Sequence, residues 1–311
     1  MKTNDVGHGR VKLTRIALGT AELGDLYTEI NQSQADRTVA RAWDCGIRYF
    51  DTAPHYGVGL SEIRVGRALQ AYSRDDYVLS TKVGRLLRPN PDGQQERVWD
   101  FSASGVRRSL AESMERLGLG RIDIALIHDP SDAGPSDLDR AIQEAAPALA
   151  EMRDAGELRA IGVGTRDVTA LLRFVRETDV DVLMVAGRMN LVNHSAFQEL
   201  VPECERRGVS IINAGIFATG LLAQRQPTDA DHYEYDSVPV DVLQRARQLA
   251  HQLGNVGITL PHAAVQFALA PAVVASAVVG ASNPSEVSDA VKWADQEVPV
   301  GLWGDLGLPH S

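Results

Sequence analysis

Cysteine is scarce in this chain of 311 residues: Cys45 and Cys204 are the only two. Two cysteines cannot build the disulfide framework of a small secreted protein. No cluster of cysteines and histidines has the spacing of a zinc site, so we expect no bound metal. The length of the chain instead allows it to bury a large hydrophobic core.

Positive charge is also in short supply. Lys and Arg total 31 against 41 for Asp and Glu, which gives a net charge of −10. Nucleic acids and anionic membranes both bind basic surfaces, so we expect neither as a partner. The charge balance favours a neutral or weakly charged small molecule as the substrate. It leaves the oligomeric state open.

The sequence has no long apolar run and no targeting signal. The most apolar stretch, residues 263–280, is interrupted by Gln266 and Pro271, which predicts a helix, a break and a strand rather than a membrane span. Residues 1–14 are mostly polar and lack the apolar region of a signal peptide. We therefore expect a cytoplasmic protein.

What the sequence does contain is an alternation of short apolar runs with helical patterns. The runs are near-continuous, as in parallel strands covered on both faces. There are eight, which predicts a closed (β/α)8 TIM barrel that occupies residues 1–311 as one domain. The alternative is an open doubly wound sheet with G-x-G-x-x-G after an early strand, and residues 19–24 do not match that spacing. The expected strands are Ile16–Gly19, Arg48–Asp51, Tyr77–Lys82, Ile122–His128, Ala160–Gly164, Val182–Val185, Ser210–Ala214 and Val273–Gly280.

Between the expected strands, apolar residues recur every three or four positions, which predicts helices that bury one face. Gly118, Gly156 and Gly208 follow such segments, and we expect them to end helices in the left-handed conformation. The apolar stripes are Val106, Leu110, Met114 and Leu117, then Ile142, Ala145, Leu149 and Met152, then Leu171, Leu172 and Val175.

Three of the expected strands end in a reactive side chain, namely Asp51, Lys82 and His128. The carboxyl ends of barrel strands open on one face, where such folds carry out chemistry. Tyr56 stands five residues beyond Asp51 in a glycine-containing loop. Each residue alone also has a structural explanation, such as a turn cap or a packed aromatic. Their joint placement on one rim favours a proton-transfer site.

These four side chains suit proton transfer at a carbonyl or alcohol oxygen. A tyrosine titrates near ~10, and a neighbouring ammonium lowers its pKa by stabilising the phenolate, which is a role for Lys82. Asp51 would hold Lys82, and His128 would orient a substrate oxygen. The set contains neither a nucleophile beside a base nor a metal cage. A useful reaction therefore requires a redox cofactor.

Two connections at the same rim are longer than usual, residues 84–101 and 217–240. The first contains Trp99 and the second contains Tyr233 and Tyr235. We expect these aromatics to line the substrate site, although they could instead anchor their loops.

A helix start is predicted directly after the eighth strand. Asn283 is followed by Pro284, and Glu286 stands three residues beyond Asn283, as in a capping box. Free amides at a helix start can bind phosphate, and barrels commonly bind phosphate after the eighth strand. We therefore expect this segment to contact a cofactor.

Several motifs of the chain resemble those of the aldo-keto reductases, and the resemblance covers nearly its whole length. It implies an NAD(P)-dependent (β/α)8 barrel in which Tyr56 donates or accepts the proton, assisted by Lys82, Asp51 and His128. The motifs are Gly46–Ala53 with Tyr56, Glu62 and Gly66, then Ser80-Thr81-Lys82, and then Ile127-His128.

Within that family the chain is most similar to the D-threo-aldose (L-fucose) 1-dehydrogenase branch, with pyridoxal 4-dehydrogenase-like members nearby. This similarity implies oxidation of the anomeric hydroxyl of an aldose, or of a related alcohol, to a lactone or carbonyl. Alternatives are a general aldehyde or ketone reductase, a nicotinamide-binding regulatory barrel, and a metal-free barrel isomerase. The similar segments are Trp99–Ser102, His128–Pro130, Ile161–Gly164, Ala186–Arg188 and Tyr233–Tyr235.

The resemblance also implies contacts and shows departures. It places His55, Trp99 and Tyr233 at the substrate. The chain has Gly164-Thr165 where the family has Ser-Asn, Ala186 where it has glutamine, and Ala214 where it has a ring-stacking aromatic, with Phe217 as the nearest substitute. The cofactor contacts that it implies are Thr20, Asp51, Thr165, Phe217, Gly220, Leu222, Gly280, Ala281, Ser282 and Glu286.

The segment after the eighth strand predicts that NAD is preferred over NADP. NADP-preferring members of the family place basic residues there to bind the extra phosphate. Residues 280–290 contain no Lys or Arg, and Glu286 stands where the resemblance places a key arginine. NADP remains possible if a basic residue from another loop, such as Arg225, reaches the site.

Overall fold

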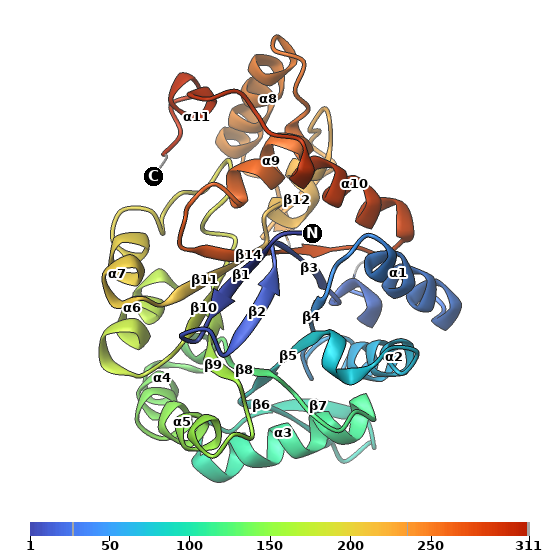
Figure 1. The fold of residues 1–311 in the computed structure, drawn as a ribbon, viewed down its shortest axis with the longest axis vertical. Helices are drawn as coiled ribbons and strands as arrows, with labels where there is room; N and C mark the ends of the chain where they lie inside the picture. The colour runs from blue at the N-terminus through green and yellow to red at the C-terminus, as the bar shows by residue number, and fades with distance from the viewer. Residues whose placement is uncertain (27, 235, 310–311) are drawn as a thin grey trace.

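The strands form a closed barrel. A computed structural model of the chain describes residues 1–26, 28–234 and 236–309. Eight parallel strands pair in a ring, and helices surround them (Figure 1), so the predicted (β/α)8 barrel is confirmed. In ring order the strands are β3 (Ile16–Gly19), β4 (Tyr49–Asp51), β5 (Val78–Val83), β8 (Ile124–His128), β9 (Ala160–Thr165), β10 (Val182–Ala186), β11 (Ser210–Ala214) and β14 (Val274–Gly280).

The helices bury the predicted faces with one exception. Met114 is 39% exposed, so its place in a buried stripe was wrong, whereas the other residues of the three stripes are buried. Gly118, Gly156 and Gly208 have positive φ, as expected. The helices are α1 (Gln32–Asp44), α2 (Leu60–Leu69), α3 (Ala103–Leu117), α4 (Pro135–Arg140), α5 (Ala146–Asp154), α6 (Val168–Glu177), α7 (Leu200–Arg207), α8 (Val240–Gly254), α9 (Leu260–Ala268), α10 (Pro284–Asp295) and α11 (Leu302–Asp305).

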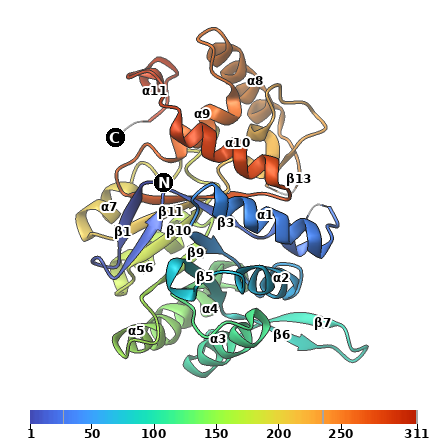
Figure 2. The ribbon, with the colours of Figure 1, turned by 45° about the vertical axis from the view of Figure 1, so that its right-hand side comes forward.

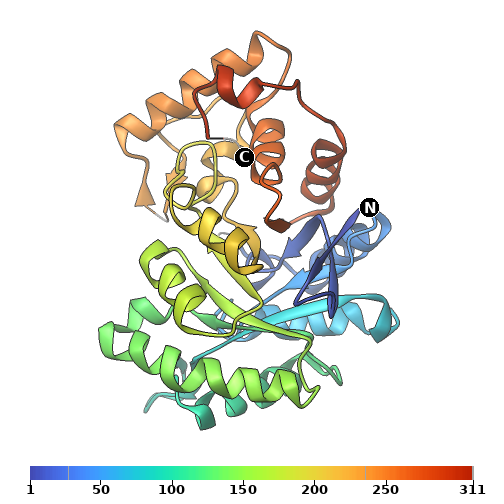
Figure 3. The same ribbon diagram turned by 60° about the vertical axis from the view of Figure 1, so that its left-hand side comes forward.

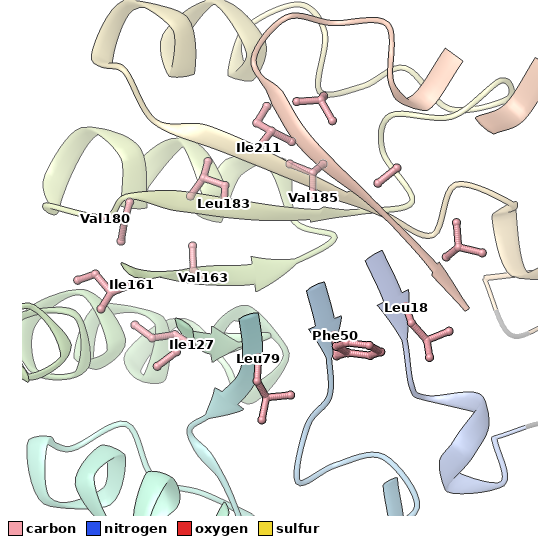
Figure 4. Packing of buried hydrophobic residues seen from close by; sticks show 14 of the residues in the cluster. Leu18, Phe50, Leu79, Ile127, Ile161, Val163, Val180, Leu183, Val185 and Ile211 are labelled. Atoms are coloured by element: carbon pink, nitrogen blue, oxygen red, sulfur yellow. The ribbon is translucent and has the colours of Figure 1, made fainter. Parts of the chain in front are cut away.

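Alternation along the strands separates a packing layer from the barrel interior. Phe50, Leu79 and Ile127 belong to the large cluster between the sheet and the helices (Figure 4). Their neighbours Tyr49 and Leu126 belong to a different cluster inside the barrel. The same alternation directs the reactive residues at the strand ends into the barrel mouth.

A hairpin that the sequence did not predict covers the amino-terminal end of the barrel. Strands β1 (Thr3–Val6) and β2 (Val11–Thr14) pair antiparallel, and the hairpin lies across the barrel in Figure 1. Its apolar side chains join the interior cluster, which closes this end. Arg10 at its turn pairs with the buried carboxylate of Asp181. The carboxyl end is thereby left as the open face.

The two long connections contain structure of their own. Residues 84–101 form a β-hairpin, β6 (Arg85–Pro89) with β7 (Gln95–Trp99), which extends away from the barrel in Figure 2. Residues 217–240 contain a short helical segment, Ala218–Ala223, and a second small hairpin, β12 (His232–Tyr233) with β13 (Asp236–Ser237). A separate hydrophobic cluster joins this second segment to α8, α9 and α11. These helices lie together at the top of the molecule in Figure 3.

Close packing of α2 on α3 generates a stability prediction. A Cβ added at Gly66 would lie 2.0 Å from the backbone oxygen of Leu117, whereas one added at Gly254, also in a helix, would meet nothing within 4 Å. Alanine favours a helix over glycine by about 1 kcal/mol. We expect Gly254→Ala to raise the free energy of unfolding by up to that amount and Gly66→Ala to lower it by about 2 kcal/mol or more.

Urea unfolding of the two variants measures this difference. Alanine favours the helix over glycine at both positions. A lower free energy of unfolding in Gly66→Ala would therefore come from the interhelical contact. A Gly66→Ala variant as stable as the wild type would show that the helices move apart at little cost.

Candidate active site

A buried ion pair lies at the mouth of the barrel. The Lys82 ammonium is 2.7 Å from Asp51 Oδ2, and each side chain is only 2% exposed. Lys82 also donates to the carbonyl of Thr52 at 3.0 Å. The pair joins the ends of β4 and β5, which are neighbours in the ring. The sequence placed these two residues together, and the structure brings them into direct contact.

Two interior hydroxyls support the Asp51 carboxylate. Ser80 donates to Asp51 Oδ1 at 2.6 Å, and the hydroxyls of Ser80 and Tyr49 are 3.0 Å apart. Burial raises the pKa of Tyr49 well above its usual value, so its hydroxyl stays protonated. Sequence reasoning missed this support, although the alternation of β4 and β5 puts Tyr49 and Ser80 on the interior side.

Three aromatic rings gather above the ion pair. The Lys82 ammonium lies 4.8 Å from the centroid of the Tyr56 ring. The rings of Tyr56 and His128 meet edge to face with centroids 6.1 Å apart, and His55 is 5.5 Å from His128. The structure therefore brings together all four residues predicted for proton transfer, together with His55.

Both histidines are held in the neutral form. Burial lowers the pKa of His128 well below its usual value, and the charges of Arg85 and Lys82 lower it further. Burial and the nearby Arg85 lower the pKa of His55 to about 4. A neutral imidazole can donate one hydrogen bond and accept another, which suits orientation of a substrate oxygen.

Arg85, at the start of the β6–β7 hairpin, is a residue that the sequence did not single out. Its guanidinium lies 2.6 Å from Asp129 and 4.2 Å from the centroid of the Trp99 ring. Trp99 also stacks on Phe101, with centroids 5.6 Å apart. Trp99 is thus engaged within its own hairpin, and its predicted contact with a substrate stays a prediction.

A cavity that is open to solvent lies at the carboxyl ends of β8 to β11. Tyr233 is in its lining, and its predicted contact with a substrate stays a prediction; Tyr235 lies outside the described residues. A Cβ added at Gly187 would meet nothing within 4 Å, so a flat ring has room against this backbone. The lining residues are Asp129, Arg166, Ala186, Gly187, Arg188, Asn190, Gly215, Ala218, Thr219, Tyr233 and Glu234.

The predicted cofactor residues follow the rim on both sides of the catalytic strands. Thr20 donates to the backbone oxygen of Asp51 at 2.9 Å, and Thr165 ends β9 as a buried residue. Gly220 has a left-handed backbone with open space around it. The open space at Gly220 is compatible with a bound nicotinamide cofactor, and the cofactor contacts of these residues stay a prediction.

Two of the predicted cofactor residues have side chains directed elsewhere. Leu222 is fully buried in the cluster with α8 and α9. Phe217 packs edge-on against Trp293 of α10, with centroids 6.4 Å apart, and is not in the lining of the cavity. Contact of Leu222 with a cofactor through its backbone, and stacking by Phe217, stay predictions.

The predicted helix start at Asn283 is confirmed, with a variant of the capping box in which Glu286 bonds to the amide of Ser282, one residue before the N-cap. Asn283 accepts from the amides of Ser285 and Glu286, and Glu286 accepts from the amide of Ser282 at 2.8 Å. These amides therefore already have partners within the protein. A phosphate at this helix start would have to displace the Glu286 carboxylate.

A second carboxyl group, Glu22, lies close to the same segment. A Cβ added at Gly280 would be 2.1 Å from Glu22 Oε1. Burial, together with the charge of Glu286, raises the pKa of Glu22 to about 7. Glu22 could not be identified from the sequence, because its approach to Gly280 depends on the pairing of β3 with β14.

The described part of the chain contains no group of three or more His, Cys, Asp or Glu side chains that could hold a metal ion. Across residues 1–26, 28–234 and 236–309, no helix is both long and apolar enough to cross a membrane.

Comparison with known proteins gives matches over nearly the whole chain. A sequence model of the Aldo/keto reductase family matches residues 15–299. A D-threo-aldose 1-dehydrogenase from a Pseudomonas species is 43% identical over 94% of this chain and 92% of its own length. A pyridoxal 4-dehydrogenase from Microbacterium luteolum is 30% identical over 97% of this chain and 95% of its own length.

Among solved structures, the holo form of an aldo-keto reductase from Bacillus halodurans superimposes with a TM-score of 0.79 at 24% identity. It covers 98% of this chain and 95% of that one. At this level of identity the similarity shows the fold.

The neutral histidines generate a prediction about pH. The pKa of His55 is about 4 in the folded chain and near ~6.5 when unfolded. The unfolded state therefore binds more protons below ~6.5, and stability is lost as the pH falls from there towards 4. We expect the free energy of unfolding of His55→Gln to depend less on pH between 7 and 5 than that of the wild type.

Urea unfolding at several pH values provides the measurement, with His251→Gln, an exposed histidine on α8, as the control. The control should follow the wild-type slope. Identical slopes for all three proteins would mean that the pKa of His55 is the same in the folded and the unfolded state.

Proposed function

Because this chain belongs to the aldo/keto reductase family, we propose that it is a nicotinamide-dependent dehydrogenase that oxidises the anomeric hydroxyl of an aldose to a lactone. The observation that carries the chemistry is the buried Asp51–Lys82 pair, whose ammonium lies 4.8 Å from the Tyr56 ring beside a neutral His128. The substrate class rests on the relative that is 43% identical and acts on D-threo-aldoses.

The proposed roles follow from position and charge. Tyr56 accepts the proton of the anomeric hydroxyl during oxidation. The Lys82 ammonium stabilises the phenolate form of Tyr56, and Asp51 keeps that ammonium in place. His128 holds the reacting oxygen by a hydrogen bond without charging it. A bound nicotinamide cofactor supplies the hydride acceptor.

A pyridoxal-type alcohol is the second candidate substrate, because another relative of similar length is a pyridoxal 4-dehydrogenase. Rates with a panel of aldoses and with pyridoxal, followed by the absorbance of the reduced cofactor, distinguish the two. Turnover without any nicotinamide would favour an isomerase, and cofactor binding without turnover would favour a regulatory barrel.

We further propose that NAD is the preferred cofactor. Glu286 occupies the amide of Ser282 and the side chain of Asn283 at the start of α10, and the Glu22 carboxyl lies at the adjacent Gly280. Residues 280–290 contribute no positive charge. The extra phosphate of NADP would therefore meet one or two carboxyl groups and no cation in this segment, whereas ribose hydroxyls can donate to them.

The role of Tyr56 is tested on the best substrate of the panel. We expect Tyr56→Phe to lower kcat by about 10² or more, the scale of general acid–base catalysis, with the dissociation constant of NADH unchanged. Tyr72→Phe, which removes the hydroxyl of a tyrosine stacked on Trp43, is the matched control and should keep normal turnover. A Tyr56→Phe enzyme with normal kcat would exclude Tyr56 as the proton carrier.

Cofactor preference is tested by reversing the charge at the start of α10. The wild type should show a higher kcat/KM for NAD than for NADP. Glu286→Arg should shift that ratio towards NADP by about tenfold or more, since arginine binds phosphate through two hydrogen bonds. Asp295→Arg, at the far end of the same helix, makes the same change of charge and should leave the ratio as it was. A wild-type preference for NADP would refute the proposal.

A further inference from the structure

Arg85 is fixed on several sides at the edge of the active site. Its side chain is 9% exposed, and Nη2 lies 2.6 Å from Asp129 and 3.3 Å from Asp132. The guanidinium covers the Trp99 ring at 4.2 Å. Arginine side chains are flexible in solution, so this set of contacts presents the planar group in one orientation before any substrate binds.

Part of the hydrogen-bonding capacity of this group remains unused. Among the described residues, Arg85 Nε is buried without a hydrogen-bond partner. The other terminal nitrogen, Nη1, faces only the imidazole of His55, at 3.3 Å. Unpaired buried donors are costly, and in a binding site they commonly await a ligand.

The carboxylate partner lies beside both the histidine and the cavity. Asp129 follows His128 directly, lines the cavity, and has a left-handed backbone with φ of 42°. Its Oδ2 is 3.4 Å from His128 Nε2. A non-glycine residue in this conformation is strained, and such strain is commonly found at functional sites.

We propose that Arg85 and Asp129 determine substrate specificity by binding the hydroxyl on the carbon next to the one that is oxidised. This inference rests on the proposed oxidation of an aldose. His128 Nε2 and Asp129 Oδ2 lie only 3.4 Å apart, so oxygens on adjacent carbons of one sugar can reach both groups. A sugar whose reacting oxygen is held by His128 therefore places its neighbouring hydroxyl at Asp129.

The chemistry of the pair matches a hydroxyl group. A hydroxyl donates one hydrogen bond, which the Asp129 carboxylate accepts, and it accepts others, which Arg85 can donate. The two charges compensate each other, so a neutral substrate binds without leaving an unpaired charge. A substrate that lacks this hydroxyl would leave both groups partly unsatisfied, which is a strong basis for discrimination.

A comparison of the preferred aldose with its 2-deoxy counterpart tests the proposal. We expect the wild type to favour the hydroxylated sugar by about 10² or more in kcat/KM. Asp129→Asn and Arg85→Lys should lose most of that ratio, because their rates fall much more on the hydroxylated sugar. Asp132→Asn is the matched control, since Asp132 contacts Arg85 from an exposed position and should keep the ratio.

The outcomes are distinct. A wild type that treats both sugars alike overturns the proposal whatever the variants do. Equal losses on both sugars in Asp129→Asn and Arg85→Lys also overturn it, because they would show that the pair only ties the hairpin to β8. An enzyme that oxidises no aldose would refute the proposed function itself, whereas an aldose dehydrogenase with an unchanged ratio would refute this inference alone.

Discussion

The ion pair between Asp51 and Lys82 is the interaction on which the rest of the site depends. Both side chains are 2% exposed, and removal of two charges from water costs more than their attraction returns unless every remaining polar atom is satisfied. Here Ser80 donates a hydrogen bond to the carboxylate, and the carbonyl of Thr52 accepts one from the ammonium. The partners come from two neighbouring strands of the closed barrel, β4 and β5, and from Thr52 directly after β4. The barrel that excludes water from the pair therefore also sets its geometry.

A second pair of opposite charges, Arg85 and Asp129, lies beside β8, the next strand in the ring. Arg85 compensates Asp129, which would otherwise draw a proton onto the adjacent His128. Burial lowers the pKa of the same histidine, and the charges of Arg85 and Lys82 lower it further. The mouth of the barrel therefore contains charged side chains that are paired with one another, together with neutral imidazoles. Such a site can polarise a neutral molecule without attracting an ion.

The sequence predicts the barrel and its reactive residues because both depend on local pattern. A parallel strand covered on both faces requires a continuous apolar run, and its last inward-facing residue necessarily reaches the open end. Asp51, Lys82 and His128 could therefore be placed together without coordinates. The pairing of Asn283 with Glu286 is equally local, and it was predicted for the same reason.

What the sequence did not predict depends on contacts between distant segments. The amino-terminal hairpin has only three apolar side chains that reach the barrel, too few for a clear strand pattern. Arg85 stands in a segment expected to be a loop, and its role appears only when the hairpin β6–β7 meets the end of β8. Met114 fits the helical period but lies where α3 faces solvent. The helical period predicts which side of a helix is apolar. It does not predict how much of that side the rest of the protein covers.

The site divides in the same way, between groups proposed to transfer the proton and groups proposed to select the substrate. The groups proposed to move the proton lie on strand ends or in the short loop after β4, where the closed barrel restrains them. The groups proposed to select the substrate lie on the β6–β7 hairpin, the residues after β8 and the second long connection. Changes in those segments leave the partners of the Asp51–Lys82 pair in place, because Ser80 and Thr52 lie outside them. Substrate range can therefore change between relatives of this chain more readily than the chemistry does.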